Sequence, residues 1–324
     1  MQLEPEVGLS LERSGEMESS KSFPCKSSVP VVSTVDVHLR VGPPAGDDGF
    51  TTNQKASGPG QAFGSFPFNY PPVYSRNGLQ FVKHLSANDE NQVFAIVRNK
   101  STANLLRELS RSNVTIVEAD VTDATALNAA AAEVAKATNN KLDYLINNTG
   151  SNTMPGLTID RLISPTPEAF EKDLQENLKN NAISVVHSTN AFLPLLKNGS
   201  TKKVLTLSST VGHMGFTLQS DLTASVTYAM AKTAMNIVAK FATIYRADGF
   251  IFLSICPGMV DTSPTQTAPP PAGMVAEFKL ITESLSKTMS TIPPPISVEE
   301  SVRMQLEVFN NWPLERSGEM VSHL

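Results

Sequence analysis

Residues 93 to 146 read VFAIVRNKSTANLLRELSRSNVTIVEADVTDATALNAAAAEVAKATNNKLDYLI. The pattern of strands and helices is clearest in this segment. Its short runs of branched apolar residues have the length and composition of buried strands, at 93–97, 114–117 and 142–146. Two segments with helical character separate them, 105–109 and the alanine-rich 124–137. Strands that alternate with helices in this way predict βαβ units and a parallel sheet covered on both faces.

The same alternation extends on both sides of this stretch. A helix is expected before it, at 79–85, and a short strand near 318–322 is expected to end the pattern. The elements expected between them are a long helix at 170–196, a strand at 204–207, a helix at 228–245 and a strand at 250–255. The sequence therefore predicts the α/β class, as a single domain built on a doubly wound, Rossmann-like parallel sheet.

The composition changes near residue 70. Residues 1–72 hold 8 of the 18 glycines and 9 of the 22 prolines, a density that disfavours helices and ladder pairing. We therefore expect residues 1–70 to form an irregular, poorly ordered extension and residues 71–324 to form the folded domain. Within the extension, Val29–Val41 has the composition of a strand.

Charge and composition exclude several classes of function. The chain has 26 basic and 31 acidic side chains, so it has no basic footprint of the kind that nucleic acids or anionic membranes attract. No apolar run approaches the roughly 18 residues that span a bilayer, and the acidic start does not resemble a signal peptide. Two cysteines are too few for a disulfide scaffold and show no metal-ligand spacing. We therefore expect a cytoplasmic protein with no nucleic-acid or membrane partner and no metal.

Tyr228 and Lys232 are the first candidates for chemistry. They lie four positions apart in a predicted helix, so both side chains project from one face. A phenol with an ordinary pKa near 10 is a poor acid–base catalyst at neutral pH, but a neighbouring ammonium favours the phenolate. Alone, this spacing also occurs by chance, as a surface lysine near a half-buried tyrosine.

Polar residues follow three of the predicted strands. One strand runs into Ser208–Ser209, a second into Asn147–Gly150 and a third into Pro257–Thr262. Since open α/β sheets bind ligands at the carboxyl ends of their strands, these segments are expected to meet at one rim.

Taken in order, these motifs resemble the short-chain dehydrogenase/reductase family, and more closely its fungal carbonyl-reductase-like and C-factor-like branch. The resemblance covers residues 78 to about 320. It rests on Asp120–Val121, N-N-x-G at 147–150, Asn181 thirteen residues before Pro194, S-S at 208–209, Y-x-x-x-K at 228–232 and P-G-x-V-x-T at 257–262. The segment between Ser209 and Tyr228 is longer than in the commonest members of the family.

The resemblance implies a catalytic set. Tyr228 is expected to donate a proton to a carbonyl oxygen, or to accept one in the reverse direction, and Lys232 to lower the pKa of Tyr228 and hold the ribose hydroxyls. Ser209 is expected to bind the substrate oxygen, and Asn181 to anchor a water that connects Lys232 to solvent. The expected reaction is hydride transfer between a nicotinamide cofactor and a carbonyl or alcohol.

The resemblance also implies cofactor contacts. Asp120, Val121 and Asn147 are expected at the adenosine end and Thr262 at the nicotinamide end. Further cofactor contacts are expected from Gly78, Gly150, Pro257, Gly258 and Val260. The second strand is followed by Arg98 instead of an acidic residue, and a cation at this place accommodates a 2′-phosphate, so NADPH is favoured over NADH. For each of these residues the plain alternative is a turn, a cap or a solvated charge.

The chain departs from the family at the start of the domain. Members open with a strand that leads into T-G-x-x-x-G-x-G, whose glycines let the backbone approach the pyrophosphate. Here only the last glycine, Gly78, is present, and Pro72 and Arg76 stand at the other two places. Either Val29–Val41 supplies the missing central strand, or a deletion between residues 73 and 76 removed it; we favour the deletion.

Two functions stay open on the sequence alone. The first is an NADPH-dependent oxidoreductase acting on an apolar or mixed carbonyl compound. The second is a catalytically silent member of the family that binds cofactor weakly or not at all.

A proline-flanked amphipathic segment at 274–285 suits a lid over the nicotinamide. The resemblance also allows a homodimer, paired through the helix of Tyr228 and the long helix before Leu196.

Overall fold

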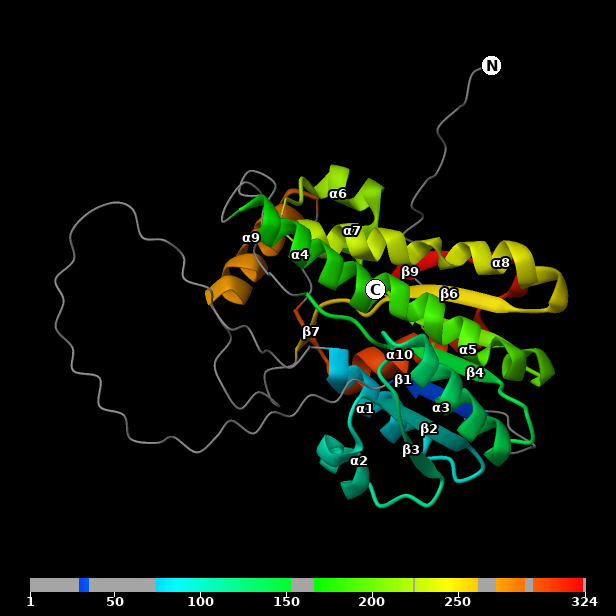
Figure 1. The fold of residues 1–324 in the computed structure, drawn as a ribbon. Coiled ribbons are helices and arrows are strands. Elements are labelled where there is room, and N and C mark those ends of the chain that lie inside the picture. Colours follow the sequence, from blue (N-terminus) through cyan, green and yellow to red (C-terminus); the bar gives the residue numbers. More distant parts are fainter. Residues whose placement is uncertain are drawn as a thin grey trace, which may run out of the picture.

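The computed structural model describes residues 29–34, 74–152, 166–223, 225–261, 272–288 and 294–322. Their main sheet has seven strands in the order β3-β2-β1-β4-β5-β6-β9, and every neighbouring pair is parallel (Figure 1). The strands are β1 (Pro30–Thr34), β2 (Gln92–Val97), β3 (Val114–Glu118), β4 (Tyr144–Asn147), β5 (Lys203–Leu207), β6 (Ile251–Cys256) and β9 (Met320–Ser322). The predicted doubly wound parallel sheet is confirmed.

Strand β1 occupies the central position of this sheet. Val32 pairs with Phe94 of β2 on one side and with Leu145 of β4 on the other, and Val31 and Val32 are buried. Without β1, the facing edges of β2 and β4 would leave backbone groups unpaired in the core. The structure therefore has the segment beginning at Val29 in the place of the missing strand, as the first of our two hypotheses expects. The deletion that we favoured concerns the origin of residues 73–76 and stays a hypothesis.

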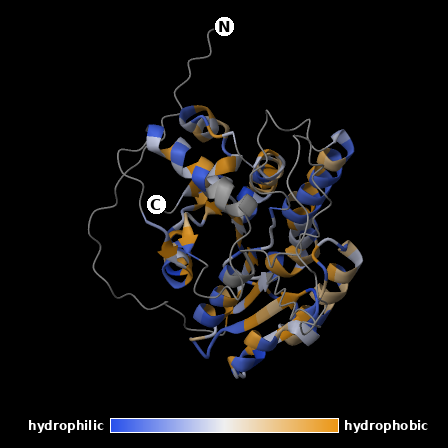
Figure 2. Cartoon of the chain, turned by 90° about the vertical axis from the view of Figure 1, so that its left-hand side faces the viewer, coloured by the Kyte–Doolittle hydropathy of each residue, from blue (hydrophilic) through white to orange (hydrophobic). Residues whose placement is uncertain are grey.

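Helices cover both faces of the sheet. They are α1 (Tyr74–Leu85), α2 (Asn104–Glu108), α3 (Ala124–Ala137), α4 (Pro167–Leu178), α5 (Ser184–Asn198), α6 (Met214–Ser220), α7 (Val226–Met235), α8 (Ala239–Tyr245), α9 (Ala272–Thr288) and α10 (Val298–Asn311). Phe94 and Ile96 of β2 pack in the layer of α3, α5 and α8, whereas its Val93, Ala95 and Val97 pack in the layer of α1, α2 and α10. This alternation is the period of two expected for a strand buried on both faces. Figure 2 shows the apolar strands between helices of mixed hydropathy.

The long helix predicted over 170–196 is interrupted. Between α4 and α5 the chain forms one π-helical segment, η3 (Lys179–Ile183), and a 3-10 turn, η5 (Asn236–Val238), separates α7 from α8 in the same way. Hydrophobic periodicity does not detect a single wider turn, because the apolar face continues on both sides of it. Such π segments in α-helices are frequent at functional sites.

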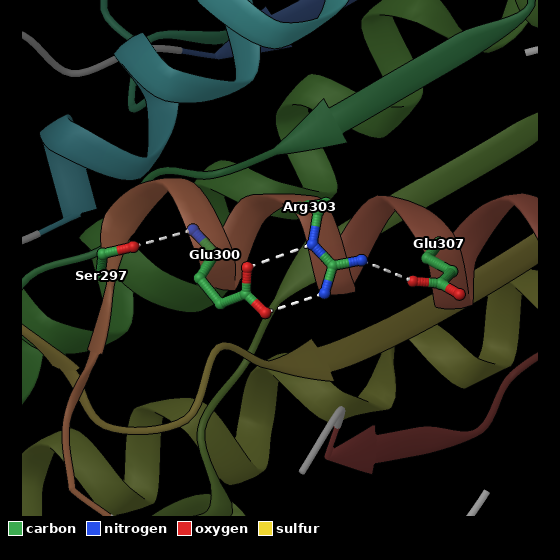
Figure 3. Close-up of polar contacts among 4 residues, drawn as sticks. All are labelled: Ser297, Glu300, Arg303 and Glu307. Carbon is green, nitrogen blue, oxygen red and sulfur yellow. Dashed lines mark hydrogen bonds and ion pairs between the residues drawn. The ribbon is translucent and has the colours of Figure 1, made fainter. Parts of the chain in front are cut away.

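Helix α10 is stabilised at both ends and along its exposed face. The Ser297 Oγ accepts a hydrogen bond from the Glu300 N–H, and Arg303 bridges Glu300 and Glu307 (Figure 3). At the other end, the buried Lys203 Nζ donates to the carbonyls of Phe309 and Asn310, at 3.0 and 2.7 Å. A cation on the last carbonyls of a helix satisfies orphan acceptors and complements the helix dipole.

A second, two-stranded sheet lies beyond β6. It pairs β7 (Val260–Asp261) with β8 (Ile296–Ser297), so the segment after Pro257 is tied to the start of α10. Across the part of the chain that the structure describes, no helix is both long enough and apolar enough to cross a bilayer.

Candidate active site

Tyr228 and Lys232 lie side by side in α7. Both side chains are buried, and the Lys232 Nζ lies 5.5 Å from the centroid of the Tyr228 ring. The predicted i, i+4 placement on one helix face is therefore confirmed. A cation at this distance from the ring is attracted to its π face and lowers the free energy of a phenolate.

Lys232 is completely buried. Its Nζ donates a hydrogen bond of 2.9 Å to the Leu207 carbonyl, at the carboxyl end of β5. Burial lowers the pKa of Lys232 to about 7, although the nearby Cys256 acts in the opposite direction. The amine can therefore gain or lose a proton at neutral pH, which an ordinary lysine does not do.

Ser209 is the second residue after β5, where it caps the 3-10 turn η4 (Thr210–Gly212). Its Oγ accepts a long hydrogen bond, 3.4 Å, from the Val211 N–H. Gly212, at the end of this turn, packs directly on α7: an added Cβ would lie 2.8 Å from the Lys232 carbonyl carbon. The close approach fixes the turn that carries Ser209 against the helix that carries Lys232.

Asn181 is fully buried in the π-helical segment η3. Its side-chain amide makes two hydrogen bonds to the backbone of Ser151: Nδ2 donates to the Ser151 carbonyl at 2.8 Å, and Oδ1 accepts from the Ser151 N–H at 3.2 Å. Asn181 thereby fixes the segment that follows β4.

Sequence reasoning missed three further polar residues of this site. The Thr227 hydroxyl and the Asn177 Nδ2 both donate hydrogen bonds to the Asp173 carboxylate, and the Asn181 Nδ2 donates to the Asn177 carbonyl at 2.9 Å. All four side chains are buried. The spacing of Asp173, Asn177 and Asn181, four residues apart, could have revealed this polar stripe on one helix face.

Arg98 and Asp120 lie together at the other end of the rim, after β2 and β3. The Arg98 Nε is 3.5 Å from the Asp120 Oδ2, and both side chains are more than one-third exposed. Burial tends to raise the pKa of Asp120, but hydrogen bonds from the Thr122 N–H and hydroxyl, with the charges of Arg98 and Lys179, outweigh it and lower the pKa. The carboxylate is therefore ionised at neutral pH.

Apart from Gly78, the remaining predicted cofactor residues that the structure describes also lie after strands of the main sheet. Gly78 lies within α1 and is buried, Val121 belongs to the core beside Asp120, and Gly150 is buried after β4. Gly258 has a left-handed backbone with a φ of 72°, and Val260 lies in β7. The Pro257 carbonyl accepts a hydrogen bond from the Ser301 hydroxyl. Thr262 lies outside the described residues.

Three buried polar oxygens near the carboxyl ends of central strands have no hydrogen-bond partner among the described residues. They are the Ser33 Oγ in β1, the Asn147 Oδ1 in β4 and the Thr206 Oγ1 in β5. All three lie in the last two residues of their strands, close to the rim of the sheet. The carboxyl rim of the sheet extends from Arg98, after β2, to Ser209, after β5. These two strands are three strand spacings apart, about 14 Å, so the rim is long enough for an elongated molecule.

Comparison with known proteins agrees with this geometry. The family model for short chain dehydrogenase matches residues 78–271. The chain belongs to the short-chain dehydrogenase/reductase family. It is 41% identical over 257 residues to the short-chain dehydrogenase/reductase atnB of Arthrinium sp, covering 76% of this chain and 92% of the relative. The short-chain dehydrogenase/reductase AacuF of Aspergillus aculeatus is 36% identical over 255 residues, covering 76% and 93%. The chain is thus an oxidoreductase of a family that binds NAD(P).

Solved structures give the same result. NADPH-bound carbonyl reductase from chicken fatty liver is 27% identical with a TM-score of 0.58, and the match covers 76% of this chain and 92% of that one. Carbonyl reductase Sniffer of D. melanogaster is 20% identical with a TM-score of 0.59 over the same shares, and this likeness supports the fold alone.

Proposed function

We propose that this short-chain dehydrogenase/reductase reduces the carbonyl group of a small molecule with NADPH, or oxidises the corresponding alcohol, and that Ser209, Tyr228, Lys232 and Asn181 form its catalytic set. The observation that carries the proposal is the burial of the Lys232 Nζ beside the Tyr228 ring, on a helix whose neighbours deliver Ser209 and Asn181. Tyr228 and Lys232 are the residues that would hold the nicotinamide ribose of such a cofactor.

The bound cofactor supplies the hydride that reaches the carbonyl carbon. Ser209 orients the carbonyl oxygen through its hydroxyl, and Tyr228 donates the phenolic proton to the same oxygen. Positive charge on Lys232 stabilises the phenolate that remains, because opposite charges at short range favour the ionised form. Tyr228 regains its proton from Lys232, whose pKa near 7 suits both steps.

Asn181 serves the same cycle indirectly. We assign it the anchoring of a water through which Lys232 exchanges protons with solvent. Its buried place in a π-helical turn supports this role, since the wider turn changes which backbone carbonyls are bonded within the helix.

The choice of NADPH rests on Arg98. It follows β2 at the place where an acidic residue would bind a free ribose 2′-hydroxyl, and its guanidinium can form paired hydrogen bonds to a 2′-phosphate. Asp120 holds the Arg98 side chain in position from the neighbouring strand. The NADPH in the chicken carbonyl reductase agrees with this assignment.

The substrate class follows from the residues near Ser209. Met214 and Phe216 of α6 and Met259 after β6 are apolar and at least partly exposed. An apolar or mixed carbonyl compound suits them better than a polyanion. Residues 274–285, which the sequence suggests as a lid over the nicotinamide, fall within α9.

We also assign this chain a homodimeric state. Met230, Ile237 and Ile244 recur every seven residues along α7 to α8 and are 45%, 58% and 65% exposed. This spacing places them on one face of nearly continuous helix, and Ile183 of η3 is also exposed. A second copy packing α7 and α8 against the same face would bury Met230, Ile237 and Ile244.

Oxidation of NADPH in the presence of a panel of simple ketones tests the proposed activity. The wild-type protein is expected to turn over at least one ketone, and Tyr228→Phe to lower kcat roughly 10³-fold, because it removes only the proton donor. Turnover in Tyr228→Phe within twofold of the wild type would contradict the assignment. Absence of turnover in both proteins would favour the catalytically silent alternative.

A further inference from the structure

We propose that Asp173 is a positioning residue of this active site, and that its buried carboxylate holds the Tyr228 turn of α7 in register with Asn181. The inference rests on the proposed function and extends it to a residue that does not touch substrate or cofactor. Asp173 lies in α4, outside every motif by which the family was recognised.

The contacts form a continuous buried chain between the two helices. The Thr227 hydroxyl donates to the Asp173 Oδ2, and the Asn177 Nδ2 donates to the same oxygen at 3.2 Å and to the Thr227 Oγ1 at 3.4 Å. The Asn181 Nδ2 then donates to Asn177 through the carbonyl, at 2.9 Å, and through Oδ1, at 3.4 Å. One end of the chain is thus the residue before Tyr228, and the other is Asn181.

The start of α7 explains why a carboxylate is useful there. Its N-cap residue, Ser225, has a left-handed backbone with a φ of 58°, and its side chain makes no capping hydrogen bond. Negative charge near a helix N-terminus interacts favourably with the helix dipole. Asp173 supplies this charge from a neighbouring helix, through the hydroxyl of the second residue of α7.

Packing alone does not account for the carboxylate. Burying an ionised group costs free energy that apolar residues of similar size avoid, so two helices that only needed to adhere would meet through apolar side chains. A fully connected polar network, in contrast, permits one register. Here that register sets the Tyr228 phenol relative to Asn181 and to Ser151, which Asn181 holds.

Four variants test this role. Thr227→Val removes the hydroxyl with little change in shape, and Thr227→Ser returns it. Asp173→Asn removes the negative charge and keeps one acceptor oxygen, and the double variant Asp173→Asn/Asn177→Asp returns a carboxylate to the chain of contacts. Thr138→Val is the matched control, because it removes another buried threonine hydroxyl, which donates to the Val134 carbonyl in α3.

Ketone reduction with NADPH, the dissociation constant of NADPH and the melting temperature are measured for each protein. Thr227→Val and Asp173→Asn are expected to lower kcat tenfold to a hundredfold, with KM and the dissociation constant within about twofold, because a small misplacement of a catalytic group acts on the chemical step. Thr227→Ser and the double variant are expected to recover most of kcat. Thr138→Val is expected to lower the melting temperature without the loss of kcat.

Wild-type kcat in Thr227→Val and Asp173→Asn, or no recovery in both rescue variants, would overturn the proposal. If Asp173→Asn does not fold, Thr227→Val decides alone. The proposed function fails separately: a wild-type protein without Tyr228-dependent turnover removes both proposals, whereas Tyr228-dependent turnover that Thr227→Val leaves unchanged removes only the role of Asp173.

Discussion

Arg98 is the residue that we expect to determine which dinucleotide is preferred. Arg98→Ala removes the guanidinium that would meet the 2′-phosphate and leaves Asp120 on the same edge, where its carboxylate repels a phosphate. The expected result is at least tenfold weaker binding of NADPH with NADH binding changed less than twofold, measured by fluorescence titration of both. Lys136→Ala, on the exposed end of α3, is the control for loss of a surface cation. Equal weakening for both dinucleotides would contradict this role of Arg98.

The residues of the site differ in how far sequence predicts them. The spacing of Tyr228 and Lys232 was enough to place both on one helix face. The pKa of Lys232 could not be predicted, because it depends on burial of the side chain in the folded protein and on Cys256, which is distant in the chain. Asp173 and Thr227 were missed because their hydrogen bond joins two helices whose packing the sequence does not show.

Among the elements, the turn η4 and helix α7 are in close contact, where Gly212 packs against Lys232. Gly212→Ala would place a Cβ 2.8 Å from backbone and side-chain carbons of Lys232, where neither chain segment can easily move. We expect it to lower the free energy of unfolding by about 1–3 kcal/mol and kcat by about tenfold or more, since Ser209 and Lys232 are pushed apart.

The matched control for this prediction is Gly215→Ala in α6. Its added Cβ would meet the side-chain ring of His213, at 3.1 Å, and no backbone atom, and alanine is the better helix former, so the stability loss should be smaller. Chemical denaturation and steady-state kinetics measure both variants. Equal stability in the two variants would show that the contact with Lys232 imposes no constraint.

Elements with strong periodicity were predicted closely, and those set by distant partners were not. Residues 124–137 were expected to be helical and form α3 with the same bounds. The π-helical segment at Asn181 was not expected, because a periodic apolar face does not record one wider turn. It is positioned by its contacts with Ser151 and Asn177, which belong to the tertiary structure.

At the scale of the whole molecule, the sheet takes its central strand from a segment that composition assigns to an irregular extension. Pro30–Thr34 is short and stands in a glycine- and proline-rich region, so only its pairing with β2 and β4 distinguishes it from a loop. Strand order depends on pairing between segments that are distant in the chain. The sequence therefore indicated that a central strand was missing near residue 73, but it did not indicate that Val29–Val41 would take its place.

The exposed face formed by Met230, Ile237 and Ile244 gives a prediction about assembly. Ile237→Asp places a charge in the centre of this face, and because Ile237 is 58% exposed the fold should tolerate it. Light scattering during gel filtration is expected to give a dimer for the wild type and a monomer for Ile237→Asp. Lys136→Asp, at the exposed end of α3 and outside this face, tests whether any new acidic residue has this effect. A monomeric wild-type protein at micromolar concentration would contradict the prediction.

The proposed function requires that a nicotinamide dinucleotide bind at the carboxyl rim of the sheet, beside Tyr228 and Lys232. The most direct measurement is a fluorescence titration of the full chain with NADPH, using the wild type and Tyr228→Phe. We predict a dissociation constant in the micromolar range or tighter for both proteins, with ketone-dependent oxidation of the bound NADPH only in the wild type. A folded wild-type protein that shows no saturable binding of NADPH would contradict the proposed binding site and function.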